Sequence, residues 1–185
     1  MKRVKRQYNK GFTLIEILVS LSVFVVVMTI SLGAILSVTD MNEKVRTRKT
    51  AIDNLNFALD SMSRTIRFGT VYHCGGGTIS TPLDCASGDT SVSVLASDGN
   101  RVTYAFSNGA ITKSINSGTP TALTSSEITI TAVRFRVFGS APYASDSLNL
   151  QPQMIITVQG TVGTKTKTQS SFSIETTVSQ RKLDI

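Results

Sequence analysis

The chain has 185 residues, enough for one ordinary domain with an appendage but not for two full domains. Its formal net charge is +7, yet five of the positive residues lie in residues 1–11, which contain no acid, so 7 − 5 leaves +2 for the remainder. So small a charge excludes any inference of polyanion binding from composition alone.

Residues 12–39 are predicted to be the transmembrane half of a long helix. The 23 residues from Ile17 to Thr39 carry no formal charge, and about 20 residues cross a bilayer core of roughly 30 Å. A secretory signal peptide is the main alternative. Its apolar core would be shorter, about 7–15 residues, and Leu32-Gly33-Ala34 is a poor match to its cleavage site.

Residues 40–69 are predicted to be the amphipathic half of the same helix. No proline interrupts residues 12–68, and Gly69 is a natural stop. Apolar residues recur at steps of three, four or seven, as in a helix packed on one side; they are Met41, Val45, Ile52, Leu55, Leu59, Met62 and Ile66. A removable signal would not be continuous with a structural helix.

Glu16 lies just before the uncharged run, after Phe12-Thr13-Leu14-Ile15. A lone carboxylate at mid-bilayer costs about 2.5–3.5 kcal/mol on insertion scales, and such groups are usually paired and functional. A glutamate at the level of the lipid headgroups costs little. For an uncleaved anchor this second interpretation stays open.

Lys10-Gly11-Phe12-Thr13-Leu14-Ile15-Glu16, after a short basic leader and before an apolar helix, resembles the type IV prepilin signature. The resemblance covers roughly residues 1–68. In that family an inner-membrane prepilin peptidase cleaves after the glycine and methylates the new amino terminus. The resemblance implies that residues 1–11 are a leader peptide cleaved between Gly11 and Phe12, that Phe12 is N-methylated, and that Glu16 is the fifth-position glutamate of the family.

The pairing of Phe12 with Glu16 has a physical reason. Cleavage leaves a cationic amine on Phe12, which would be costly to leave unpaired in an apolar filament core. A glutamate on the neighbouring subunit would compensate that charge and fix the axial register. The positive-inside count is nearly balanced, but long carboxy-terminal domains translocate largely regardless of flanking charge. We therefore expect a cytoplasmic amino terminus and an external head.

Residues 70–185 are predicted to form a β-rich globular head. Short strands are expected at residues 92–94, 102–106 and 110–115, with turns at Ser97–Asn100 and at Asn108-Gly109, because these residues tolerate positive φ. Later alternating runs follow at 154–162 and 172–178, with a polar turn near Gly163–Lys167.

Residues 127–138 form the longest strand candidate. Ile128 and Ile130 share one parity, whereas Val133 and Phe135 share the other, which indicates a bulge or bend near Ala132. The apolar parity could face the second half of the helix. We predict an α+β fold with the helix packed on an antiparallel sheet, which is also the architecture of pilins.

Cys74 and Cys85 enclose ten residues that include Gly75-Gly76-Gly77. Given export, a disulfide is the favoured interpretation, and so short a loop would contribute about 2–3 kcal/mol. Two thiols and the adjacent His73 do not complete a tetrahedral metal set. We expect no metal and no cofactor. Free thiols are the alternative for a cytoplasmic domain.

His73 is the single histidine, and we expect it at the surface rather than in a catalytic pair with Cys74, because no recognisable catalytic constellation accompanies it. No P-loop or H-E-x-x-H occurs, and we expect no enzymatic activity. A basic patch for DNA is an alternative, since Arg134 and Arg136 share a strand face; the other candidates are Arg64, Arg67, Lys165 and Lys167.

The leading interpretation is a structural subunit of a type IV pilus or a type II secretion pseudopilus. Its expected partners are the prepilin peptidase, other pilin or pseudopilin subunits, the inner-membrane assembly platform and, before assembly, lipid of the cytoplasmic membrane. Gly33 replaces a proline common in principal pilins, and Thr176–Arg181 resembles the ending of minor pilins and J-type pseudopilins, which favours a minor subunit.

Two alternatives remain. One is a DNA-uptake or adhesive pilin whose head binds DNA or a surface ligand. The other is an ordinary single-pass anchored protein whose leader match is accidental. In the leading interpretation the chain is a single-pass protein of the inner membrane and then part of an extracellular or periplasmic filament.

Overall fold

The structure, a computed structural model, describes residues 11–76, 79–141, 151–163 and 169–181. It divides the chain into two compact units, Met1–Glu43 and Lys44–Ile185. Most of the predicted leader, the turn at 164–167 and the last four residues lie outside the described residues. The boundaries expected at residues 39 and 69 stay predictions of domain organisation.

A single helix, α1 (Leu14–Phe68), begins in the first unit and continues into the second. It ends where Gly69 N–H donates to the Ile66 carbonyl at 3.0 Å. A Cβ at position 69 would lie 2.3 Å from Val94 Cγ1, so the turn after the helix requires a glycine. The predicted helix and its stop are confirmed.

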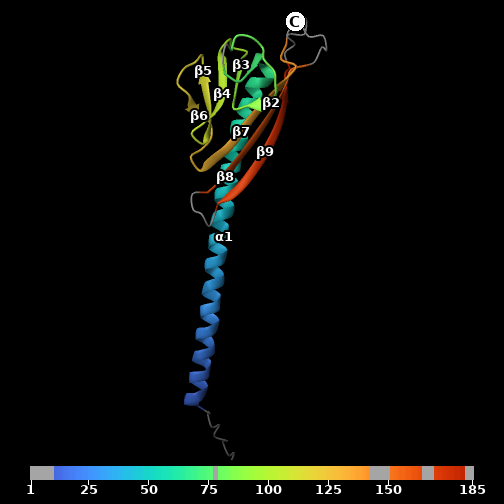
Figure 1. The fold of residues 1–185 in the computed structure, drawn as a ribbon. Helices are drawn as coiled ribbons and strands as arrows, with labels where there is room; N and C mark the ends of the chain where they lie inside the picture. Colours follow the sequence, from blue (N-terminus) through green and yellow to red (C-terminus); the bar gives the residue numbers. More distant parts are fainter. Residues whose placement is uncertain (1–10, 77–78, 142–150, 164–168, 182–185) are drawn as a thin grey trace, which may run out of the picture. The chain divides into compact units, whose positions relative to one another are not determined.

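The second unit contains two antiparallel sheets (Figure 1). The first has the order β1-β3-β4-β5-β6; its strands are β1 (Thr70–Cys74), β3 (Ser91–Leu95), β4 (Arg101–Ser107), β5 (Ala110–Ile115) and β6 (Thr121–Ala122). β4 and β5 are joined at Asn108 and Gly109, whose φ angles are 51° and 73°. Both angles are positive, as the hairpin signal predicts.

The second sheet has the order β2-β7-β8-β9; its strands are β2 (Cys85–Asp89), β7 (Ile128–Phe138), β8 (Gln153–Val162) and β9 (Ser170–Ser179). The register of β7 against β8 shifts between Ile130 and Ala132. Because of this bulge, Ile130 before it and Val133 after it are both buried. The predicted bulge near Ala132 is confirmed.

One hydrophobic core joins the helix to both sheets. The buried face of α1 consists of Ala51, Leu55, Ala58, Leu59, Met62 and Ile66. It packs with Val94 and Tyr104 of the first sheet and with Phe135 and Ile156 of the second. The α+β class is confirmed; the head contains two sheets where one was expected.

The amphipathic stripe packs over a shorter length than predicted. Met41 and Val45 are 68% and 61% exposed, and the buried face begins at Ala51. No described residue of α1 before Ala51 is buried. Ala51 and Ala58 were not predicted because small side chains add little to a hydropathy pattern, yet they allow close approach of the helix to the sheets.

Candidate functional site: the amino-terminal segment of the helix

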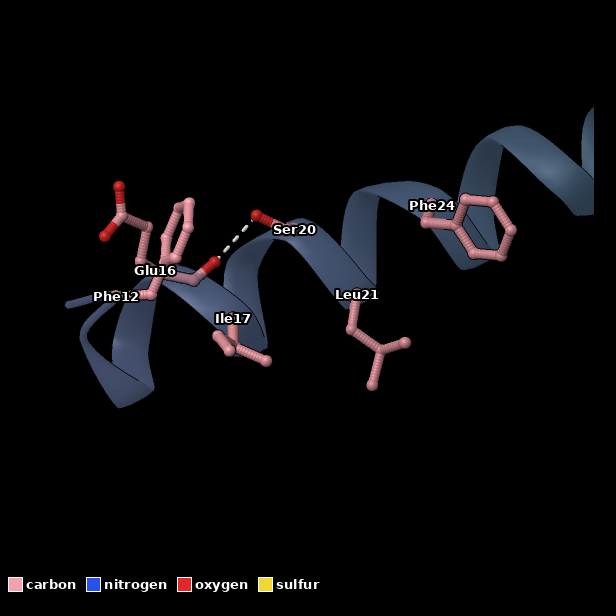
Figure 2. A pocket seen from close by; sticks show the side chains of 6 residues that line it. All are labelled: Phe12, Glu16, Ile17, Ser20, Leu21 and Phe24. Carbon is pink, nitrogen blue, oxygen red and sulfur yellow. Dashed lines mark hydrogen bonds between the residues drawn. The ribbon is translucent and has the colours of Figure 1, made fainter.

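The first three turns of α1 form the candidate site. A hollow of about 470 Å³ is lined by Phe12, Glu16, Ile17, Ser20, Leu21 and Phe24. Figure 2 shows the Phe12 ring beside Glu16 and the Glu16 carboxylate directed away from the helix, while Ile17 and Leu21 lie together on another side. The structure therefore brings the two predicted site residues together at one end of an apolar surface.

Thr13 and Glu16 have the spacing of a capping box at the start of α1. Glu16 N–H donates to Thr13 Oγ1 at 3.4 Å, and Thr13 N–H donates to Glu16 Oε2 at 3.5 Å. Both distances exceed the usual 2.7–3.2 Å. The local contacts are therefore weak and leave most of the carboxylate's acceptor capacity for another partner.

Ser20 does not compete for that carboxylate. Its hydroxyl donates to the backbone carbonyl of Glu16 at 2.7 Å (Figure 2). Ser22, Thr29, Ser31 and Thr39 bond to backbone carbonyls of α1 in the same way. These five hydroxyl groups are thus bonded within the helix, which suits an apolar surrounding.

The apolar side chains of this segment are not buried within the protein. Phe12 and Leu14 are 81% and 79% exposed. α1 contains a strongly apolar stretch of 18 residues, and none of that stretch is buried. A helix of this length and composition can cross a membrane. So much exposed apolar surface requires lipid or other protein chains to cover it.

The predicted disulfide is present in the head. Cys74 and Cys85 are bonded, with their Cα atoms 5.9 Å apart. Cys74 ends β1 and Cys85 begins β2, so the bond joins one sheet to the other. Within the described ranges no cluster of three or more histidine, cysteine or acidic side chains could hold a metal ion.

His73 is buried, at 4% exposure, so the expected surface position is wrong. Its Nδ1 lies 2.7 Å from the Thr81 carbonyl, and residue 73 also pairs with Leu83. Thr81 and Leu83 belong to the loop that the disulfide closes, and both contact His73. These packing contacts account for the burial of the His73 side chain without a catalytic role.

The candidate basic residues are not all on one element. Arg64 and Arg67 lie on α1, whereas Arg134 and Arg136 lie on β7; Lys165 and Lys167 are outside the described residues. Arg134 Nη1 donates to the Ser87 carbonyl at 3.0 Å. This contact gives Arg134 a structural role against β2.

Arg181 is a neighbour of Arg67 that the sequence did not predict. Its backbone N–H donates to the Arg67 carbonyl at 2.8 Å. The two residues are 114 positions apart, and no local pattern relates them.

The fold and the site together define a protein with an exposed apolar helix at its amino terminus and an α+β head. Residues 6–32 match the family model of the prokaryotic N-terminal methylation motif, the motif of type IV prepilin leaders. The resemblance to the type IV pilin-like family is confirmed over this segment. No curated protein and no solved structure matches the chain.

The motif carries consequences beyond the leader itself. The prepilin-type pilin family is a family of structural subunits, and the motif implies processing by prepilin peptidase and assembly with other pilins. Together with the apolar part of α1, it indicates a membrane-anchored protein with a carboxy-terminal head.

Proposed function

We propose that the chain is a structural, non-enzymatic subunit of a type IV pilus or a type II secretion pseudopilus. The main support for this proposal is that the methylation motif at residues 6–32 overlaps a helix whose apolar side chains are exposed. A peptidase that removes the leader after Gly11 would free this helix to leave the membrane and enter a filament. Lipid covers the helix before assembly, and other subunits cover it afterwards.

Phe12 and Glu16 take separate roles in this proposal. Phe12 becomes the methylated amino terminus, and its cationic amine needs a counter-charge in an apolar filament core. The Glu16 carboxylate has only long contacts within its own turn, at 3.5 Å. It is therefore available to pair with the amine of a neighbouring subunit and to fix the axial register between the two.

Gly33 and the ending Thr176–Arg181 favour a minor rather than a principal subunit. α1 continues through Gly33, where many principal pilins carry a helix-breaking proline. The head lies on the external side of the inner membrane, held by one span, and the specific partners are other pilins or pseudopilins and the assembly platform.

The decisive measurement is the mass of the amino-terminal peptide of the full chain recovered from its membrane, after production with an active prepilin peptidase. We expect a chain that starts at Phe12 with one added methyl group on its amine. A matched sample with an inactive peptidase should retain Met1–Gly11. Retention of Met1–Gly11 under the active enzyme would leave a plain membrane anchor and contradict the proposal.

A further inference from the structure

A second hollow lies where the last turns of α1 meet the end of β9, within the unit Lys44–Ile185. Its volume is about 340 Å³, and it is lined by Asp60, Ser63, Arg64, Arg67, Phe68 and Arg181. We refer to it as the arginine hollow. Three of its six lining residues are arginines, and neither the leader nor the apolar part of α1 contributes to it.

Helical spacing and one tertiary contact assemble the arginine hollow. Asp60, Arg64 and Arg67 are separated by four and three residues, which places them on one face of α1. Arg181 follows β9 and is held at the last turn of the helix by its backbone N–H, which donates to the Arg67 carbonyl at 2.8 Å. The backbone of the third arginine is therefore fixed by the fold rather than by a solvated loop.

The positive charge of the arginine hollow exceeds its negative charge. Three arginines and one aspartate give 3 − 1 = +2. Asp60 pairs with Arg64 at 3.2 Å, and both side chains are more than 70% exposed, so solvent screens this pair. In the part of the chain that the structure describes, neither Arg67 nor Arg181 forms an ion pair.

The helix dipole accounts for part of this arrangement only. A cation in the last turn of a helix is favoured by the negative end of the dipole, and this explains Arg67. The dipole does not explain why the fold brings Arg181, which is 114 residues further along the sequence, to the same turn of the helix. Two arginines that line one small hollow are suited to an oxyanion, which guanidinium groups can bind with several charge-assisted hydrogen bonds.

The size and charge of the arginine hollow favour a single carboxylate over a nucleic-acid strand. Strong binding to duplex DNA commonly uses about 6–10 phosphate contacts along a basic track. Arg134, another candidate for such a track, donates to the Ser87 carbonyl. It also packs over Gly88, where a Cβ would come within 2.4 Å of Arg134 Cγ. A net charge of +2, with Asp60 inside the hollow, matches one acidic side chain better.

We propose that the arginine hollow receives an aspartate or glutamate side chain of an adjacent filament subunit, bound by Arg67 and Arg181. The proposal rests on the proposed function, because a filament supplies the adjacent subunit. Phe68 forms an apolar wall beside the charged groups and is 45% exposed. The partner segment therefore combines a carboxylate with an apolar neighbour, as an amphipathic surface segment would.

The test uses the full chain produced in cells together with its filament machinery. The variants are Arg67→Glu and Arg181→Glu, with Arg67→Gln as a neutral change and Lys113→Glu on β5 as the matched charge reversal in the other sheet. For each variant, the share of the chain in sheared filaments is compared with the share cleaved in the membrane. We expect Arg67→Glu and Arg181→Glu to lower incorporation about tenfold and Lys113→Glu to leave it unchanged.

A photoreactive phenylalanine analogue at position 68 then identifies the occupant. We expect a cross-link, in filaments only, to a subunit peptide that contains Asp or Glu. Changing that acid to Arg should restore incorporation of Arg67→Glu, which a merely misfolded variant could not show. A cross-linked peptide without an acid, or normal incorporation of both Glu variants, would overturn the proposal and leave the filament function intact.

Two further outcomes decide between the proposals. Retention of duplex DNA by the full chain that Arg67→Glu and Arg181→Glu abolish would assign the arginine hollow to phosphodiesters and overturn the carboxylate. A chain that keeps Met1–Gly11 under active peptidase overturns the filament function and this proposal with it.

Discussion

Glu16 lies in the first turn of α1, where its position can be explained by a capping box or by pairing between subunits. The capping contacts to Thr13 are 3.4–3.5 Å long, and loss of a good cap costs only about 1 kcal/mol. A change at Glu16 should therefore affect the helix start slightly. Its effect on an apolar assembly that contains a cationic amine should be larger.

We predict that Glu16→Ala permits membrane insertion and leader cleavage but lowers incorporation into filaments. The amine of Phe12 would then lack its counter-charge, and breaking a buried pair costs roughly 3–5 kcal/mol. The measurement is the share of the variant in purified filaments, with Ser22→Ala as the control because Ser22 Oγ donates to the Val19 carbonyl and Ser22 does not line the hollow. Normal incorporation of Glu16→Ala would contradict the pairing.

Tyr104 introduces a pH dependence into the core. Its side chain is fully buried, and burial raises the pKa of its phenol above the ordinary value of 10.0. The unfolded chain releases this proton at a lower pH than the folded chain. The contribution of the neutral Tyr104 phenol to the free energy of unfolding is therefore fully present below pH 10. It is lost as the pH rises through the folded-state pKa.

We predict that the free energy of unfolding falls less steeply above pH 10 in Tyr104→Phe than in the unmodified chain. Denaturant unfolding of both proteins between pH 8 and pH 11 provides the comparison. Lysines and other tyrosines titrate in both proteins, so the difference between the slopes isolates Tyr104. Parallel slopes would show that the phenol ionises equally in the folded and unfolded states.

At the scale of elements, the strands and the helix follow from local patterns to different degrees. The change of parity around Ala132 predicted the bulge of β7, and Asn108-Gly109 predicted the β4–β5 hairpin, because both features reside in the residues themselves. The length of α1 that packs against the strands could not be predicted from the local pattern. Val45 continues the apolar stripe, yet it is exposed, and the buried face of α1 begins only at Ala51.

The disulfide connects two strands that are not paired by hydrogen bonds, since β1 and β2 belong to different sheets.

We predict that replacing Cys74 and Cys85 by serine lowers the free energy of unfolding by about 2–3 kcal/mol, the chain-entropy value for so short a loop. Urea unfolding of the full chain with and without reductant measures this. Reductant should destabilise the unmodified chain and leave the double variant unaffected. Equal stability of all samples would mean that the core alone fixes the two sheets.

At the scale of the whole molecule, the parts that sequence predicts best are those in which neighbouring residues share a role. The leader motif, the uncharged run from Ile17 to Thr39 and the alternating strands are of this kind. The meeting of Arg181 with Arg67 and the burial of His73 depend on tertiary contacts. The same applies to the division of the head into two sheets, because pairing between distant strands leaves no period in the sequence.

The apolar part of α1 is the expected membrane anchor of the whole molecule. Its side chains at Val23 and Val27 are 58% and 55% exposed, and they lie near the middle of the uncharged run. We predict that Val23→Lys combined with Val27→Lys prevents stable membrane insertion. Each lysine near the middle of a span costs about 2.5–3.5 kcal/mol, and the two lie on one face of the helix, where they repel each other.

The fraction of the full chain that resists alkaline extraction from membranes measures this effect. The matched control combines Met41→Lys with Val45→Lys, because these residues are also exposed apolar positions of α1 four residues apart but lie beyond Thr39. We expect the control to remain with the membrane and the first variant to be extracted. The reverse result, or equal retention of both, would mean that residues 12–39 are not the anchor. The exposed apolar surface of the helix would then require protein partners at every stage.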